Sequence, residues 1–291
     1  MSIFERAGAP AIHYAIDGAQ GPWLVLSHSL GCDVSMWDPQ LPALAGRYRV
    51  LRYDTRGHGR SGAGLAPYTL DELADDAAQL MDHLGIAQAT WVGFSMGGMI
   101  GQTFALKYPH RVQALVLADT TSQHGATPQS VWDERIRVAR EQGVQPLVQP
   151  AIGRWFTAGF REAQPAIVDG VAKVIASTSV EGWTGCCAAI ASVHTTGDLH
   201  RIGCPALVIV GEHDIGTPLA ASLEMHRHLP DSRLAVIADA AHMTCIEQPE
   251  RFNRALRMFL DATFGLGRPD AQSTQSDCDP SQQAVQLKGA A

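Results

Sequence analysis

The sequence predicts an α/β fold, a mostly parallel sheet covered by helices on both faces with a block of helices inserted between its two halves. Short apolar segments alternate with helical patterns along most of the chain, and this alternation is typical of the strand-helix-strand units of a parallel sheet. These segments are continuously apolar, as in strands that are buried on both faces. From about residue 121 to residue 201 this alternation is absent, and helical stretches follow one another with no convincing strand.

The predicted strands lie on either side of this helical block. They are residues 11–16, 23–27, 48–53, 89–92, 114–119, 206–211 and 233–237. This order divides the chain into a core of residues 1–120 and 202–264, a helical lid of residues 121–201, and a tail of residues 265–291. The lid contains three of the six tryptophans, which suits a cover over a binding site. The alternative is a plain helical subdomain with a tryptophan core. The tail is polar and contains Pro and Gln, so we expect it to be disordered.

Two helices of the core carry clear sequence signals. Thr69 and Glu72 form a capping box in front of apolar residues at helical spacing, and Gly85 ends that helix. The last helix, residues 250–264, repeats apolar residues every three to four positions. Each pattern predicts an amphipathic helix that packs through one apolar face.

Composition limits the class of partner. With 46% hydrophobic and 18% charged residues, the 291-residue chain is an ordinary globular protein with a sizeable core. The net charge of -7 and the lack of a Lys/Arg run argue against nucleic acid or anionic lipid, which leaves a small molecule. The sequence shows no signal peptide, no bilayer-length apolar stretch and no metal or redox spacing among its six cysteines. We therefore expect a reduced, cytoplasmic location with no membrane contact, and the oligomeric state stays open.

Residues 92–98, Val-Gly-Phe-Ser-Met-Gly-Gly, are the stretch most informative about function. An apolar strand precedes Ser95 and an apolar helix follows it, which is the context that a nucleophile elbow requires. Gly93 and Gly97 have no Cβ to collide with the adjoining strand and helix, so the turn can expose the Ser95 hydroxyl. Such a string can arise by chance in a chain with 28 glycines, and it is the context that makes Ser95 the predicted nucleophile.

A serine hydroxyl needs a base to take its proton and a third group to orient that base. Asp214 and His242 each follow the end of a predicted strand, on the same edge of the sheet as Ser95. The chain order Ser95, Asp214, His242 is the one expected for a nucleophile on such an elbow. The backbone N–H groups of Leu30 and Met96 are the expected donors to the oxyanion that forms during attack.

Other polar residues after the strands are expected to fix loops. His28 directly follows a buried strand, and a histidine there more often holds the loop through hydrogen bonds than titrates in catalysis. Asp54, Arg56 and His58 lie in a glycine-containing loop after the next strand, and we assign them the same structural role.

Along residues 1 to about 264 the chain resembles enzymes of the α/β-hydrolase fold, and more narrowly the 3-oxoadipate enol-lactonases of aromatic degradation. The resemblance rests on Ser29-Leu30-Gly31 with Met36-Trp37-Asp38-Pro39-Gln40, on residues 51–59, and on two stretches of the predicted lid, Arg154-Trp155-Phe156-Thr157 and residues 182–189. The first two recur in general hydrolases of this fold, whereas the lid stretches distinguish the lactonases. Enol-lactonases often have Asn at the position of His28, and the tail beyond Phe264 has no counterpart in their pattern.

The resemblance implies a lactone hydrolase that needs no cofactor or metal. Ser95 would attack the lactone carbonyl, an enolate would leave, and water activated by His242 would hydrolyse the acyl-enzyme to 3-oxoadipate. The partner would then be a small anionic lactone, whose carboxylate needs a cation or a cluster of neutral donors. Arg154 with Trp155 is the candidate for this role, and a solvated lid arginine is the alternative reading of Arg154.

Two other functions stay open at this point. A general carboxylesterase or lactonase could use the same triad on a different acyl group. A ligand-binding receptor on a hydrolase scaffold could use Ser95 and His242 only to hold its ligand. Binding alone does not require an intact set of Ser95, Asp214 and His242, which favours catalysis.

Overall fold

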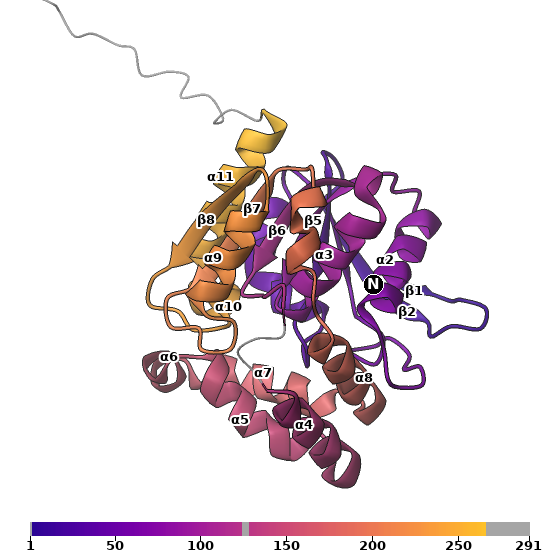
Figure 1. The fold of residues 1–291 in the computed structure, drawn as a ribbon, viewed down its shortest axis with the longest axis vertical. Coiled ribbons are helices and arrows are strands. Elements are labelled where there is room, and N and C mark those ends of the chain that lie inside the picture. Colours follow the sequence, from indigo (N-terminus) through magenta and orange to yellow (C-terminus); the bar gives the residue numbers. More distant parts are fainter. Residues whose placement is uncertain (1, 124–127, 266–291) are drawn as a thin grey trace, which may run out of the picture.

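The computed structural model describes residues 2–123 and 128–265, which are drawn in colour in Figure 1. The strands are β1 (Ser2–Phe4), β2 (Ile12–Asp17), β3 (Trp23–Ser27), β4 (Arg49–Tyr53), β5 (Ala89–Phe94), β6 (Val112–Ala118), β7 (Ala206–Gly211) and β8 (Ser232–Ile237). They form an eight-stranded sheet in the order β1-β2-β4-β3-β5-β6-β7-β8. Strand β2 runs antiparallel to β1 and β4, and every other neighbouring pair is parallel. The mostly parallel sheet expected from the sequence is confirmed.

Helices pack around this sheet and at one of its edges. Those outside the inserted block are α1 (Leu41–Leu44), α2 (Leu70–His83), α3 (Met96–Lys107), α9 (Leu219–His228), α10 (Thr244–Glu247) and α11 (Pro249–Phe264), with the 3-10 helices η1 (Val34–Gln40) and η2 (Pro109–Arg111). Between β6 and β7 the chain forms α4 (Gln129–Gln142), α5 (Gln145–Trp155), α6 (Ala158–Ala163), α7 (Pro165–Ser177) and α8 (Val180–Ala191), followed by the 3-10 helix η3 (Thr196–Arg201). Figure 1 shows α4 to α8 gathered below the sheet.

The side chains of β5 show how the two faces of the sheet are covered. Successive residues of a strand point to opposite faces, so Trp91 and Phe94 belong to different layers. Trp91 stacks on Phe104 of α3, with ring centroids 4.8 Å apart. Phe94 packs against Phe252 of α11, with ring centroids 6.4 Å apart. Helix α3 therefore covers one face, with α2 beside it, and α11 covers the other, as the continuously apolar strands predicted.

The helix boundaries follow the signals in the sequence. The Thr69 hydroxyl accepts a hydrogen bond from the backbone of Glu72, and the Glu72 carboxylate accepts one from the Thr69 N–H, so the capping box is confirmed. Gly85 follows α2 with φ +66°, a conformation that favours glycine. Strand β1 was not predicted, because three residues at a sheet edge are too few to show a pattern. The expected disordered tail, beyond residue 265, lies outside the described residues.

The cysteines and helices bear on the expected cellular setting. Cys186 and Cys187 are free and buried on α8. Among the helices described, none is both long enough and apolar enough to cross a bilayer. The cytoplasmic location stays a prediction.

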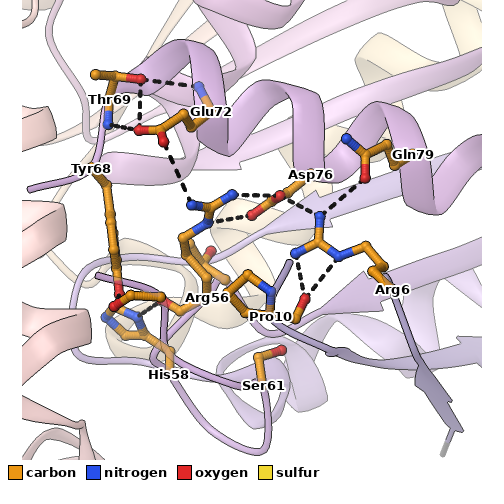
Figure 2. A network of polar contacts seen from close by, with 12 residues as sticks. Arg6, Pro10, Arg56, His58, Ser61, Tyr68, Thr69, Glu72, Asp76 and Gln79 are labelled. Carbon is orange, nitrogen blue, oxygen red and sulfur yellow. Dashed lines mark hydrogen bonds and ion pairs between the residues drawn. The ribbon is translucent and has the colours of Figure 1, made fainter. Parts of the chain in front are cut away.

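Asp76 on α2 ties two segments of the chain to this helix. Figure 2 shows its carboxylate between two guanidinium groups. Arg56, in the loop after β4, donates to both carboxylate oxygens at 2.6 and 2.7 Å, and Arg6 from the N-terminal segment donates to Oδ1. The side chains of Arg6 and Asp76 are only 3% and 5% exposed, so the carboxylate neutralises charge that water does not reach. The loop-fixing role predicted for Arg56 is confirmed.

Replacing Asp76 with Ala is expected to lower the free energy of unfolding by about 3–5 kcal/mol, because it leaves nearly buried guanidinium groups without their shared counter-ion. Urea denaturation measures this change. Asp71→Ala is the control on the same helix, because the exposed Asp71 carboxylate lies 3.6 Å from Lys107 Nζ and is expected to contribute about 1 kcal/mol or less. Equal, small losses for the two variants would contradict the role given to Asp76.

Candidate active site

The three side chains predicted to form a triad meet at the carboxyl-terminal edge of the sheet. Ser95 follows β5, Asp214 follows β7 and His242 follows β8. His242 Nε2 lies 3.0 Å from Ser95 Oγ, and His242 Nδ1 lies 2.8 Å from Asp214 Oδ2. The imidazole therefore bridges the hydroxyl and the carboxylate. In this geometry a histidine can take the serine proton while the carboxylate fixes its tautomer.

Ser95 occupies the sharp turn that the sequence predicted. Its φ of +52° and ψ of -113° are rare for a residue with a side chain, and α3 begins at the next residue. A Cβ on Gly93 would lie 2.2 Å from the Gly97 carbonyl oxygen, and one on Gly97 would lie 2.0 Å from the Ser27 carbonyl oxygen. Strand and helix can approach this closely only because both positions are glycine, which confirms the predicted reason for the motif.

Asp214 is held by its own loop as well as by His242. Its Oδ1 accepts hydrogen bonds from the backbone N–H groups of Gly216 and Thr217 at 2.7 and 3.0 Å, and the Thr217 hydroxyl donates to Oδ2 at 2.7 Å. Burial alone would raise the pKa of Asp214, but His242 and the Thr217 bonds outweigh burial and lower it. The carboxylate is therefore ionised at neutral pH. Sequence reasoning missed Thr217, although an Asp followed by N–H donors two and three residues later is a common turn pattern.

A second buried carboxyl group, Asp119, lies next to this site and was also missed. Asp119 directly follows β6, and its Oδ1 accepts a hydrogen bond from the Gly211 N–H at 2.9 Å. The Thr244 hydroxyl donates to its Oδ2. Asp119 thus joins the end of β7 to α10, two residues beyond His242. Burial and then the charge of Asp214 raise the pKa of Asp119 well above its usual value.

The C-terminal end of α5 is attached to the loop that carries His242. The Met243 N–H donates to the Trp155 carbonyl at 3.0 Å, and the Trp155 and His242 rings lie 6.2 Å apart between centroids. The buried Glu247 carboxylate accepts hydrogen bonds from the N–H groups of Ala241 and Thr157, at 2.9 and 3.0 Å. Glu247 was not predicted, because its contact with Thr157 joins segments that are 90 residues apart in the sequence.

A cavity of about 490 Å³ opens beside Ser95, within the range of small-molecule sites. His242, Leu30, Arg154 and Trp155 line it together with Ser95. One cavity is therefore lined by the predicted nucleophile, the predicted base, one oxyanion candidate and both residues suggested for substrate binding.

The second oxyanion candidate, Met96, is the first residue of α3 and directly follows Ser95. The N–H groups in the first turn of a helix have no partner within the helix, so this one can face an anion. Leu30 lies in the turn after β3, the strand that pairs directly with β5. The oxyanion role of both groups stays a prediction.

His28 fixes the turn that carries Leu30. Its Nδ1 lies 2.7 Å from the Ser29 carbonyl oxygen, so Nδ1 carries a proton, and its Nε2 accepts a hydrogen bond from the Thr55 N–H at 2.9 Å. These partners require a neutral ring, and burial lowers the pKa of His28 accordingly. The loop-fixing role predicted for His28 is confirmed.

A group of possible metal ligands lies on the surface, outside the cavity lining. Glu212, His213 and Asp239 bring one ligand atom each to within 4.8 Å of one another, and all three residues are exposed. Exposed acidic groups commonly gather in this way, so the group is no metal site on its own.

Comparison with known proteins agrees with this architecture. A family model described as alpha/beta hydrolase fold matches residues 22–249. The chain is 41% identical over 251 residues to the 3-oxoadipate enol-lactonase 2 of Acinetobacter baylyi, covering 86% of this chain and 93% of that protein. It is 30% identical over 259 residues to a putative carbamate hydrolase of Agrobacterium fabrum, covering 86% and 98%. The crystal structure of the enol-lactonase from Burkholderia xenovorans LB400 matches with a TM-score of 0.84 at 38% identity, covering 86% of this chain and 96% of that one.

Asp119→Asn should remove a pH dependence of stability. Because the pKa of Asp119 is raised in the folded protein, the protonated carboxyl group stabilises the fold. This stabilisation is fully present below the pKa of Asp in the unfolded chain, about 4, and is lost as the pH rises through the pKa in the folded protein. Asn does not titrate, and it keeps an acceptor for Gly211 and a polar partner for Thr244. The free energy of unfolding of Asp119→Asn, relative to wild type, should therefore increase above pH 4 by up to about 1.4 kcal/mol per pH unit.

Urea denaturation between pH 4 and pH 8 measures this difference. The control Asp119→Leu has a similar shape but no hydrogen-bonding atoms, and should be less stable than Asp119→Asn by about 1–3 kcal/mol at every pH. A difference between Asp119→Asn and wild type that stays constant with pH would show that Asp119 titrates normally.

Proposed function

The chain belongs to the alpha/beta hydrolase fold family, and on this premise we propose that it opens 3-oxoadipate enol-lactone through an acyl-enzyme on Ser95. The observation that carries the proposal is the hydrogen-bonded series from Ser95 Oγ through His242 to Asp214, beside a cavity of about 490 Å³. The choice of lactone is supported by relatives that are named enol-lactonases and are 41% and 38% identical to this chain.

In the proposed acylation, Ser95 Oγ bonds to the lactone carbonyl carbon while His242 Nε2 takes the hydroxyl proton. The oxyanion then accepts hydrogen bonds from the N–H groups of Leu30 and Met96. As the ring C–O bond breaks, the enolate oxygen takes the proton from His242. The enol stays attached to the acyl group, and its tautomerisation gives the ketone.

Deacylation repeats the same transfers with water. Water attacks the acyl carbon, His242 Nε2 takes the proton from water, and the proton then passes to the departing Ser95 oxygen. The product is 3-oxoadipate. Every proton and electron pair moves among substrate, water and these two side chains, so the proposed chemistry calls for no cofactor.

Helices α4 to α8 act in this proposal as the lid over the site. Arg154 and Trp155, at the end of α5, line the cavity, and Trp155 is attached to the His242 loop. The substrate carries a carboxylate away from its reacting carbonyl. We assign that carboxylate to the Arg154 guanidinium, which can donate two parallel hydrogen bonds to it.

Steady-state hydrolysis of freshly generated 3-oxoadipate enol-lactone, beside 4-nitrophenyl acetate, tests the reaction. We expect a higher kcat/KM for the lactone than for the ester, and a loss of kcat on the order of 10⁶ for both substrates in Ser95→Ala. Ser35→Ala, at an exposed serine, is the matched control and should keep wild-type rates.

The other outcomes separate the remaining functions. Turnover of the ester that depends on Ser95, with little turnover of the lactone, would indicate a general carboxylesterase and contradict the proposed substrate. Folded protein that turns over neither compound and resists a fluorophosphonate would indicate a ligand-binding receptor.

Arg154→Gln tests the assignment of the carboxylate. Loss of a charge-assisted hydrogen bond should raise KM for the anionic lactone roughly 10- to 100-fold, while kcat/KM for the neutral ester stays at the wild-type value. An unchanged KM for the lactone would show that Arg154 is a solvated lid residue.

A further inference from the structure

Two guanidinium groups line the cavity, and neither has a carboxylate partner among the described residues. Arg135 of α4 and Arg154 of α5 both line it. Across residues 2–123 and 128–265, ion pairs within 4.0 Å occupy other arginines, including Arg56 and the exposed Arg137 on the same helix as Arg135, but neither lining arginine has one. The sequence pointed to Arg154 and gave no sign of Arg135.

The two guanidinium groups are close enough to affect each other. Burial and then the charge of Arg135 lower the pKa of Arg154 to about 10, and burial lowers the pKa of Arg135 as well. Both groups still carry their charge at neutral pH. Two neighbouring charges in a partly buried space are unfavourable unless an anion neutralises them.

The carboxylate that also lines the cavity does not serve as that anion. Glu224 of α9 lies 3.6 Å from Arg227 Nη1 and 3.6 Å from His228 Nδ1, both on its own helix. Its charge is therefore shared with Arg227, which lies outside the cavity lining, and no ion pair within 4.0 Å joins Glu224 to Arg135 or Arg154 in the described part of the chain. A ligand anion can therefore supply the counter-ion that these two guanidinium groups lack.

The wall around Arg135 suits a ligand rich in oxygen. Its guanidinium lies over the Trp132 ring, 4.4 Å from the centroid. A planar guanidinium that stacks on a ring keeps its N–H groups in its own plane, available to a carboxylate.

We propose that Arg135 is a second specificity-determining residue and that it holds the substrate carboxylate jointly with Arg154. The inference rests on the proposed function and names the residue that completes its anion site. Because Arg135 belongs to α4 and Arg154 to α5, the bound carboxylate also links two helices of the lid.

The experiment compares Arg135→Gln with wild type using two readouts. The first is KM for the enol-lactone, and the second is inhibition of 4-nitrophenyl acetate hydrolysis by adipate, a dicarboxylate. Arg135→Gln should raise both the lactone KM and the adipate inhibition constant roughly 10- to 100-fold, with kcat/KM for the neutral ester unchanged. Arg135→Lys, which keeps the charge but not the fork of donors, should recover part of the loss.

Arg140→Gln is the matched control, because Arg140 lies on α4, is exposed and does not line the cavity. It should leave both readouts at their wild-type values. If Arg135→Gln folds poorly, Arg135→Met keeps the long stem over Trp132 without the charge, and the same two shifts are expected.

The adipate readout separates this inference from the proposed function. If wild type does not hydrolyse the lactone, the proposed function fails, and the adipate inhibition constants still test Arg135. The same adipate inhibition constant in wild type and in folded Arg135→Gln or Arg135→Met would overturn the inference. An equally large change of the adipate inhibition constant in Arg140→Gln would overturn the inference too, because the effect would then come from the lower net charge of the protein and not from Arg135 itself.

Discussion

The position of the His242 imidazole is the constraint on which the rest of the site depends. His242 lies in the loop after β8, and separate contacts hold the residues around it. Asp214 binds the ring, Glu247 binds the Ala241 N–H, and Asp119 binds Thr244. The three carboxyl groups come from different parts of the chain, which restricts the ring to the one position where Nε2 meets Ser95 Oγ. A loop held in this way needs little rearrangement when charge develops on the ring.

The helical insertion is attached to the core on both sides of the cavity. At one side, the end of α5 bonds to the His242 loop through the Trp155 carbonyl. At the other, α8 packs backbone against backbone on the loop after β4, where a Cβ on Gly182 would lie 2.2 Å from the Gly57 carbonyl oxygen. The glycines of the stretch 182–189 therefore have a packing role. These two attachments fix the insertion against the core, and Arg154 and Trp155 line the same cavity as Ser95.

Sequence patterns predict those features that depend on residues close together in the chain. Ser95, the strands and the capping box of α2 depend on neighbours within a few residues, and chain order was enough to select Asp214 and His242. Asp119 and Glu247 could not be predicted, because their partners come from distant elements and a single buried carboxyl leaves no periodic signal. Arg135 is a similar case: it lies among other arginines on α4, and only the packing of that helix decides which one faces the cavity.

The most direct test of the central claim is the mass of the enzyme during turnover. Protein mixed with 4-nitrophenyl acetate and quenched in acid within the first turnovers should carry one acetyl group, located on Ser95 by peptide mapping. An Asp214→Asn variant, with His242 in the wrong tautomer, should acquire the same group about 10⁴-fold more slowly. Steady turnover with no acetyl group on Ser95, or with acetylation unaffected by Asp214→Asn, would contradict a nucleophile activated through His242.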